Sequence, residues 1–165
     1  MKTRSGFVSN SSSSSFIIMG DTKNKLLVPT LPNDEILTIP DDFGGKQKFD
    51  WEVEWSSDFQ SKMNYCIVQA MQDEKVMEKV KSALEEFLNV DEIKINLTND
   101  WDKMNNKNWA YIDHQSSISE GEAQIVFISK ENIINFIFNP ESKILMGNDN
   151  GEGFYDELDK HELFL

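Results

Sequence analysis

The chain has 165 residues, of which 39% are hydrophobic, and this is enough for one globular domain with a packed core. Its 29 acidic residues against 16 basic ones give a formal net charge of −13. Because phosphate groups are normally held by clustered Lys and Arg, this charge argues against direct binding to nucleic acid or to an anionic membrane surface. It suits a protein partner with a basic surface, a divalent cation, or solubility alone.

The first 20 residues form a serine-rich segment ahead of a domain that spans residues 21–165 and ends in an acidic tail. As an exposed tail, the serines would be open to phosphorylation or to recognition by another protein. Alternatively, the apolar residues on both sides, such as Phe7 and Phe16, anchor the segment and build it into the sheet. The five consecutive serines are Ser11, Ser12, Ser13, Ser14 and Ser15.

The run R-S-G-F-V-S-N-S-S-S-S-S-F-I-I, from Arg4 to Ile18, resembles the N-terminus of small proteins from phages, prophages and low-GC Gram-positive bacteria. The segments Tyr111 to Ser116 and Gly147 to Asn150 also resemble pieces of such proteins. No activity is established for this group, so the resemblance implies a phage or mobile-element setting and no function.

Prolines and glycines interrupt residues 21–48, which leaves room only for short extended pieces at residues 25–28 and 36–39. From Phe49 to Trp55, apolar and acidic residues alternate, and this alternation predicts a strand with one face in the core. The other face would be acidic and exposed. Its side chains are candidate contacts to a basic host or phage protein, either as an inhibitory surface or as a mimic of nucleic-acid phosphates, and they are Asp50, Glu52 and Glu54.

Apolar residues then recur at helical spacing from Phe59 to Met71 and again from Val76 to Leu88. The second stripe is rotated from the first, so we expect two helices with a break near Asp73. Ser57 and Gln60 have the spacing of a capping box at the start of the first helix. The single cysteine, Cys66, lies on the apolar face and is predicted to be buried.

The second half of the chain predicts four short strands and one more helix. Ser129 is the expected N-cap of that helix, and Asn139-Pro140 ends it. The predicted fold is therefore α+β, with a mainly antiparallel or mixed sheet packed against two to three helices. The expected strands are at 92–97, 109–113 (a central strand), 124–128 and 143–146, and residues 98–108 form a polar connection.

The acidic tail can be aligned with a calcium-binding loop that has glycine at its sharp turn. Asn replaces the usual opening Asp, and Asp replaces the usual closing Glu, so binding of Ca²⁺ or Mg²⁺ would be weak. No other cofactor is predicted. The proposed ligands are Asn148, Asn150, Glu152, Asp156 and Asp159.

Asp113 and His114 follow a predicted strand and, with Asp149, could form a divalent-metal-dependent hydrolase site. No complete catalytic motif supports this arrangement, so an enzyme is the alternative hypothesis to a protein that acts by binding. The sequence favours a small acidic cytoplasmic protein that acts by binding another protein. It contains no apolar stretch of roughly 18 residues that would span a membrane.

Overall fold

The computed structural model describes residues 14–50, 52–113, 125–147 and 156, and these form a single compact domain of mixed α+β structure. The mixed α+β prediction is therefore confirmed. An antiparallel sheet contains β1 (Ser14–Ile18), β7 (Lys143–Gly147) and β4 (Glu54–Ser56), in the order β1-β7-β4. Two parallel pairs complete the strands: β2 (Ile36–Ile39) with β5 (Glu92–Ile95), and β3 (Lys48–Phe49) with β6 (Tyr111–Ile112).

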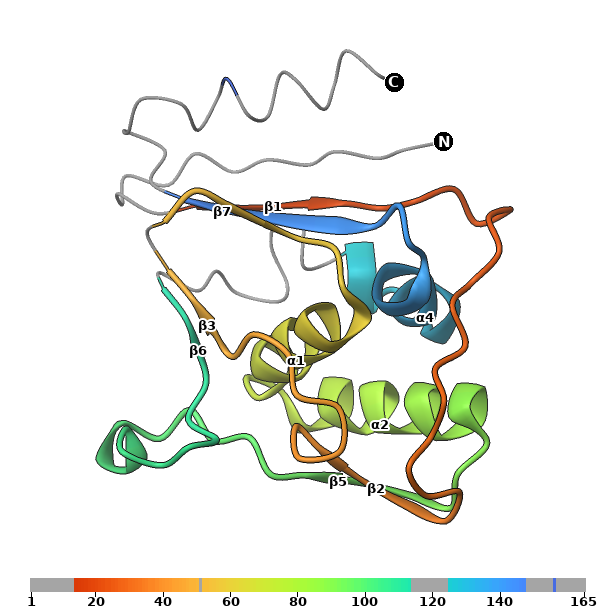
Figure 1. The fold of residues 1–165 in the computed structure, drawn as a ribbon, viewed down its shortest axis with the longest axis horizontal. Coiled ribbons are helices and arrows are strands. Elements are labelled where there is room, and N and C mark those ends of the chain that lie inside the picture. Colours follow the sequence, from red (N-terminus) through yellow and green to blue (C-terminus); the bar gives the residue numbers. More distant parts are fainter. Residues whose placement is uncertain (1–13, 51, 114–124, 148–155, 157–165) are drawn as a thin grey trace.

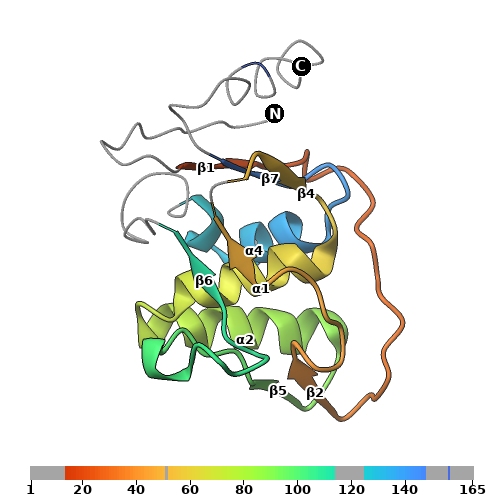
Figure 2. The same cartoon turned by 60° about the vertical axis from the view of Figure 1, so that its left-hand side comes forward.

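The helices lie between the sheets (Figure 1). The three-stranded sheet covers α1 (Phe59–Ala70) and α4 (Lys130–Phe138), while α2 (Glu74–Leu88) separates these helices from the β2–β5 pair. A turned view shows the same succession of layers (Figure 2). The core lies between them and includes the fully buried Phe49, Leu37, Ile67, Leu84, Ile93 and Phe136.

The helix boundaries follow from side-chain caps, and the predicted break is confirmed. The Asp73 carboxylate accepts the Lys75 and Val76 N–H groups and begins α2. Ser129 caps α4 as predicted. The Ser57 capping box is wrong, since the carboxylate of Asp58 accepts the Ser61 N–H and α1 begins one residue later.

The single strand predicted from Phe49 to Trp55 is wrong. The chain leaves β3 at Phe49, and β4 begins at Glu54 in a different sheet. Consequently the alternating residues do not share one buried face: Phe49 is fully buried, whereas Val53 is 40% exposed. Alternation reports a local pattern and cannot show that the chain crosses between sheets.

Two later strand predictions also need correction. Residues 125–127, part of the strand expected at 124–128, are helical, and side chains donate to two of their carbonyl groups: Asn132 to that of Ile125 and Lys79 to that of Phe127. The expected central strand at residues 109–113 is reduced to β6, and in the described part of the chain β6 pairs with β3 alone. The strand at residues 143–146 is confirmed as β7.

In the interior, asparagine and lysine side chains join segments that are far apart in the sequence. Lys62 of α1 is 1% exposed, and its Nζ donates to the carbonyls of Asn139 (2.7 Å) and Ser142 (3.1 Å). Burial lowers the pKa of Lys62 to about 8. Asn135 donates to the Gly20 carbonyl over 2.9 Å, which fixes the chain after β1 against α4.

None of the helices in the described ranges has the length and apolar character needed to cross a bilayer. Cys66 is buried as predicted, and burial raises the pKa of its thiol well above the usual range.

Candidate functional site

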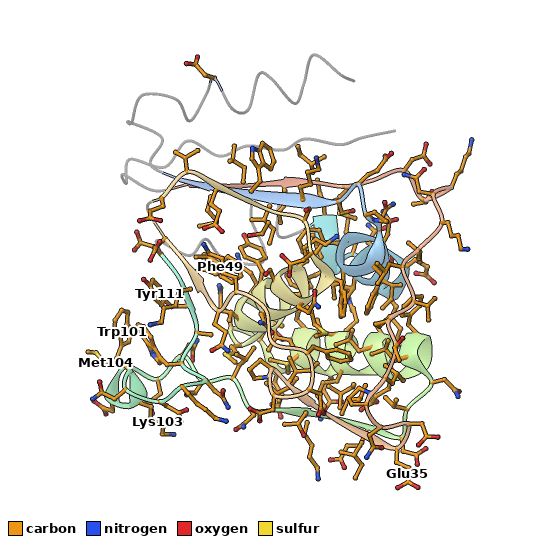
Figure 3. The ribbon with its side chains drawn as sticks, viewed as in Figure 1. Glu35, Phe49, Trp101, Lys103, Met104 and Tyr111 are labelled. Atoms are coloured by element: carbon orange, nitrogen blue, oxygen red, sulfur yellow. The ribbon has the colours of Figure 1, made fainter. Side chains whose placement is uncertain are left out.

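Among the described residues, the segment from Leu97 to Tyr111, called here the aromatic loop, carries large exposed apolar side chains. It projects from the domain beside β6 and contains a turn of 3₁₀ helix, η1 (Trp101–Lys103). Trp101 is 68% exposed and Met104 is 52% exposed, which is high for large apolar side chains. Figure 3 shows Trp101, Met104 and Tyr111 along one side of the molecule.

Three aromatic rings of the loop pack together. The ring centroids are 5.1 Å apart for Trp101 and Trp109, 4.7 Å for Trp109 and Tyr111, and 6.2 Å for Trp101 and Tyr111. At these separations the rings contact one another, as aromatic pairs in protein cores do. The cluster is therefore a platform in which Trp109 and Tyr111 pack against Trp101, and the contacts between its rings leave no space there for a ligand.

The aromatic loop is fixed to the domain through Asp41, which follows β2. The Asp41 carboxylate accepts hydrogen bonds from Asn96 (2.6 Å) and Asn108 (3.4 Å) and lies 3.4 Å from the Lys107 ammonium group. The bond from Asn96, followed by that from Asn108, lowers the pKa of Asp41. Within the loop, the Thr98 N–H donates to the Asn108 carbonyl over 3.0 Å, so its two arms are held together.

The β3–β6 pair brings polar groups to the platform. The Tyr111 hydroxyl donates to the Asp50 carboxylate over 2.8 Å. Burial, together with this bond to Asp50, raises the pKa of Tyr111 to about 12. On the same strand as Phe49, Lys48 places its ammonium group 5.5 Å from the centre of the Trp109 ring, which is a cation–π distance.

A shallow cavity of about 500 Å³ adjoins the platform, and another of about 450 Å³ lies between α2 and α4. Both volumes are in the range that small ligands occupy. Lysines and carboxylates line the first, and two of its lysines form ion pairs with carboxylates outside the lining: Lys46 with Glu54, and Lys107 with Asp41. In the second, Lys130 bridges Glu86 and Ser82 at the edge of an apolar floor. The lining of the first cavity is Gly45, Lys46, Gln47, Lys48, Asp50, Glu52 and Lys107.

The predicted acidic face is not a row on one strand. Asp50 is half-buried and bonds to Tyr111, Glu52 is exposed, and Glu54 belongs to β4 and pairs with Lys46. The structure therefore brings Asp50 to the aromatic loop and separates Glu54 from it by placing it in another sheet.

Most residues of the other predicted sites lie outside the described ranges. Of the hydrolase residues, only Asp113 is described, and its N–H donates to the Phe49 carbonyl over 2.8 Å. His114 and Asp149 lie outside. Asp156 is the one described ligand of the proposed cation loop, and it is exposed; Asn148, Asn150, Glu152 and Asp159 lie outside.

Across the part of the chain that is described, no three His, Cys, Asp or Glu residues form a group that could hold a metal ion. Ser14 and Ser15 belong to β1, where they pair with Gly147 and Met146 of β7. The backbone at these two serines is therefore built into the sheet. Ser11, Ser12 and Ser13 lie outside the described residues.

Sequence reasoning missed the aromatic loop, because residues 98–108 were expected to be only a polar connection. The available signal was the presence of two large apolar residues, Trp101 and Met104, in a stretch rich in Asn, Asp and Lys. Apolar residues without a helix or strand period have no core face to occupy, and this favours an exposed contact surface.

Comparison of the chain with protein-family models, with curated proteins and with solved structures found no match.

Proposed function

We propose that this protein acts by binding another protein, and that the aromatic loop is the docking surface. The observation that supports this most directly is the 68% exposure of Trp101 on a platform of packed rings. Tryptophan, tyrosine and methionine are enriched at the centres of protein interfaces, where a few such residues supply most of the binding energy.

Rigidity of the loop supports the same function. A flexible loop would lose conformational entropy on binding, whereas this one is already held by Asp41 and by the bond between Thr98 and Asn108. Trp101 is thus presented in a fixed position before a partner arrives.

Charge determines the kind of partner. The chain carries a net charge of −13, and Asp50, Glu52, Asp100 and Asp102 lie on or beside the aromatic loop. We therefore expect a partner that combines an apolar slot for Trp101 with a basic rim, whose association is faster at low salt. Cytoplasmic location and a phage or mobile-element source remain predictions.

The two other predicted activities are not part of this proposal. Mimicry of nucleic acid remains a prediction, although Asp50 and Glu54 already bond to Tyr111 and Lys46 within the domain. The metal-dependent hydrolase also remains a prediction, since two of its three residues lie outside the described ranges.

The proposal is tested by isolating a partner and measuring its affinity for variants. Tagged protein is recovered from cells that produce it naturally, and co-purifying proteins are identified, purified and titrated by calorimetry. Trp101→Ala should weaken binding at least about tenfold, as expected of a central interface tryptophan. Val28→Ala, which truncates another exposed apolar residue (73% exposed), is the matched control and should bind normally. Equal affinities for both variants and the original chain would refute the proposal.

A further inference from the structure

The residues around Trp101 indicate which kind of partner side chain would contact it. We propose that the partner presents an arginine whose guanidinium group stacks on the Trp101 ring and bonds to the carboxylate of Asp102. This inference rests on the proposed function, since it names the partner residue at the same surface.

The platform already binds one cation within the domain. Lys48 lies over the Trp109 ring, and the Trp101 and Trp109 rings meet at an interplanar angle of 65°. The electron-rich face of an indole attracts a cation, and Lys48 already makes such a contact with Trp109 in this cluster. Trp101 offers a second indole of the same cluster, and most of it is exposed to a partner.

The residues on either side of Trp101 favour a cation from outside. Asp100, the N-cap of η1, precedes it and Asp102 follows it, and both are exposed. Asp100 accepts the Asp102 N–H over 3.0 Å and lies 3.5 Å from the Lys103 ammonium group. Asp100 is thus engaged within the loop, and the Asp102 carboxylate is the acceptor that we assign to the partner.

Arginine fits these two groups better than lysine. Its guanidinium is planar, so it can lie flat on an indole ring while its edge donates to a carboxylate. A lysine ammonium group is a compact, strongly hydrated charge that gains less from stacking. The pair formed by Trp101 and Asp102 therefore selects for the shape of the cation as well as for its charge.

Two other ligand classes fit less well. A phosphate would have to displace existing ion pairs, because Lys46, Lys103 and Lys107 lie within ion-pair distance of Glu54, Asp100 and Asp41. A quaternary ammonium group needs a cage between rings, and the rings of this cluster contact one another.

The test compares hexa-arginine and hexa-lysine peptides, which carry equal charge and so share any non-specific attraction to the acidic chain. Binding is followed by calorimetry at low salt and by the indole N–H signal of Trp101, assigned with Trp101→Phe. We expect hexa-arginine to bind about three- to fivefold more tightly and to shift this signal. Trp101→Ala and Asp102→Asn should each reduce this preference, and Val28→Ala should preserve it.

Equal binding of the two peptides, or a preference that survives Trp101→Ala, would overturn the assignment of arginine. The proposed function fails separately. If Trp101→Ala weakens binding to the purified partner while hexa-arginine and hexa-lysine bind equally well, the docking surface is upheld and the assignment of arginine is wrong.

Discussion

The hydroxyl of Tyr111 donates a hydrogen bond to the carboxylate of Asp50 over 2.8 Å, and this bond ties the aromatic loop to the end of β3. The two residues are 61 positions apart in the sequence. The bond fixes one end of the ring platform, while the contacts of Asp41 fix the other.

Tyr111→Phe should lower the free energy of unfolding by about 1 kcal/mol, the usual net contribution of one hydrogen bond, while keeping the ring contacts. Urea denaturation followed by tryptophan fluorescence measures the change. The phenol also titrates: its folded pKa of about 12 is above the ordinary value of 10.0, so its contribution is complete below pH 10 and is lost between pH 10 and 12. A Tyr111 signal that titrates at its ordinary pKa in the folded protein would contradict this role for Asp50.

Asp41→Ala should loosen the aromatic loop while leaving the core intact. Because Asn96, Asn108 and Lys107 would lose a shared acceptor, backbone amides of residues 98–108 should exchange with solvent faster. Hydrogen exchange measured by mass spectrometry checks this, with α1 as the internal reference. Unchanged exchange in the loop would show that Asp41 does not hold it.

Acid should have a similar effect on the loop, since hydrogen bonding lowers the pKa of Asp41 below its ordinary 3.8. A depressed carboxyl pKa means that the contribution of Asp41 is present above about pH 4 and is lost as the pH falls through the folded value. In the original chain, the protection of the loop amides relative to their intrinsic exchange rate at each pH should therefore fall as the pH drops through the folded pKa of Asp41, and Asp41→Ala should remove this fall.

Lys62 should make the domain more stable as the pH rises from about 8 to about 10. Its folded pKa of about 8 is below the unfolded value, so the unfolded chain binds more protons in this window and rising pH favours the folded state. Denaturation at pH 7 and pH 9.5 should show the increase, and Lys62→Met should abolish it. At pH 7, Lys62→Met also leaves the Asn139 and Ser142 carbonyls without this donor. Each orphaned carbonyl costs about 1–3 kcal/mol, partly offset by removal of the buried charge.

Gly20→Ala should destabilise the domain, because a Cβ atom at this position would lie 2.5 Å from the side chain of Asn139. Overpacking of this kind typically costs about 1–3 kcal/mol. A thermal melt measures the loss, and a melting temperature equal to that of the original chain would show that Asn139 can move aside.

The helices could be predicted from the sequence because their stripes and caps are local. Asp73 and Ser129 each act within three residues of their own position, so the pattern around them is sufficient. The failed strands were of another kind: residues 49–55 have a perfect local alternation, yet the chain passes between two sheets within that stretch.

The arrangement of the proposed docking surface does not follow from the sequence, because contacts between distant residues hold it. Asp41 reaches Asn96 and Asn108 across 55 and 67 positions, and Asp50 reaches Tyr111 across 61. Asp50 was identified as a candidate contact residue for its charge. Its role in orienting Tyr111 follows only from the parallel pairing of β3 with β6.

The proposal that the aromatic loop is the docking surface can be checked by recording backbone and indole NMR signals with and without the purified partner. We predict that the largest changes occur at residues 97–111 and at the Trp101 indole N–H. Changes centred on the cavity between α2 and α4, with the signals of the aromatic loop unchanged, would contradict it.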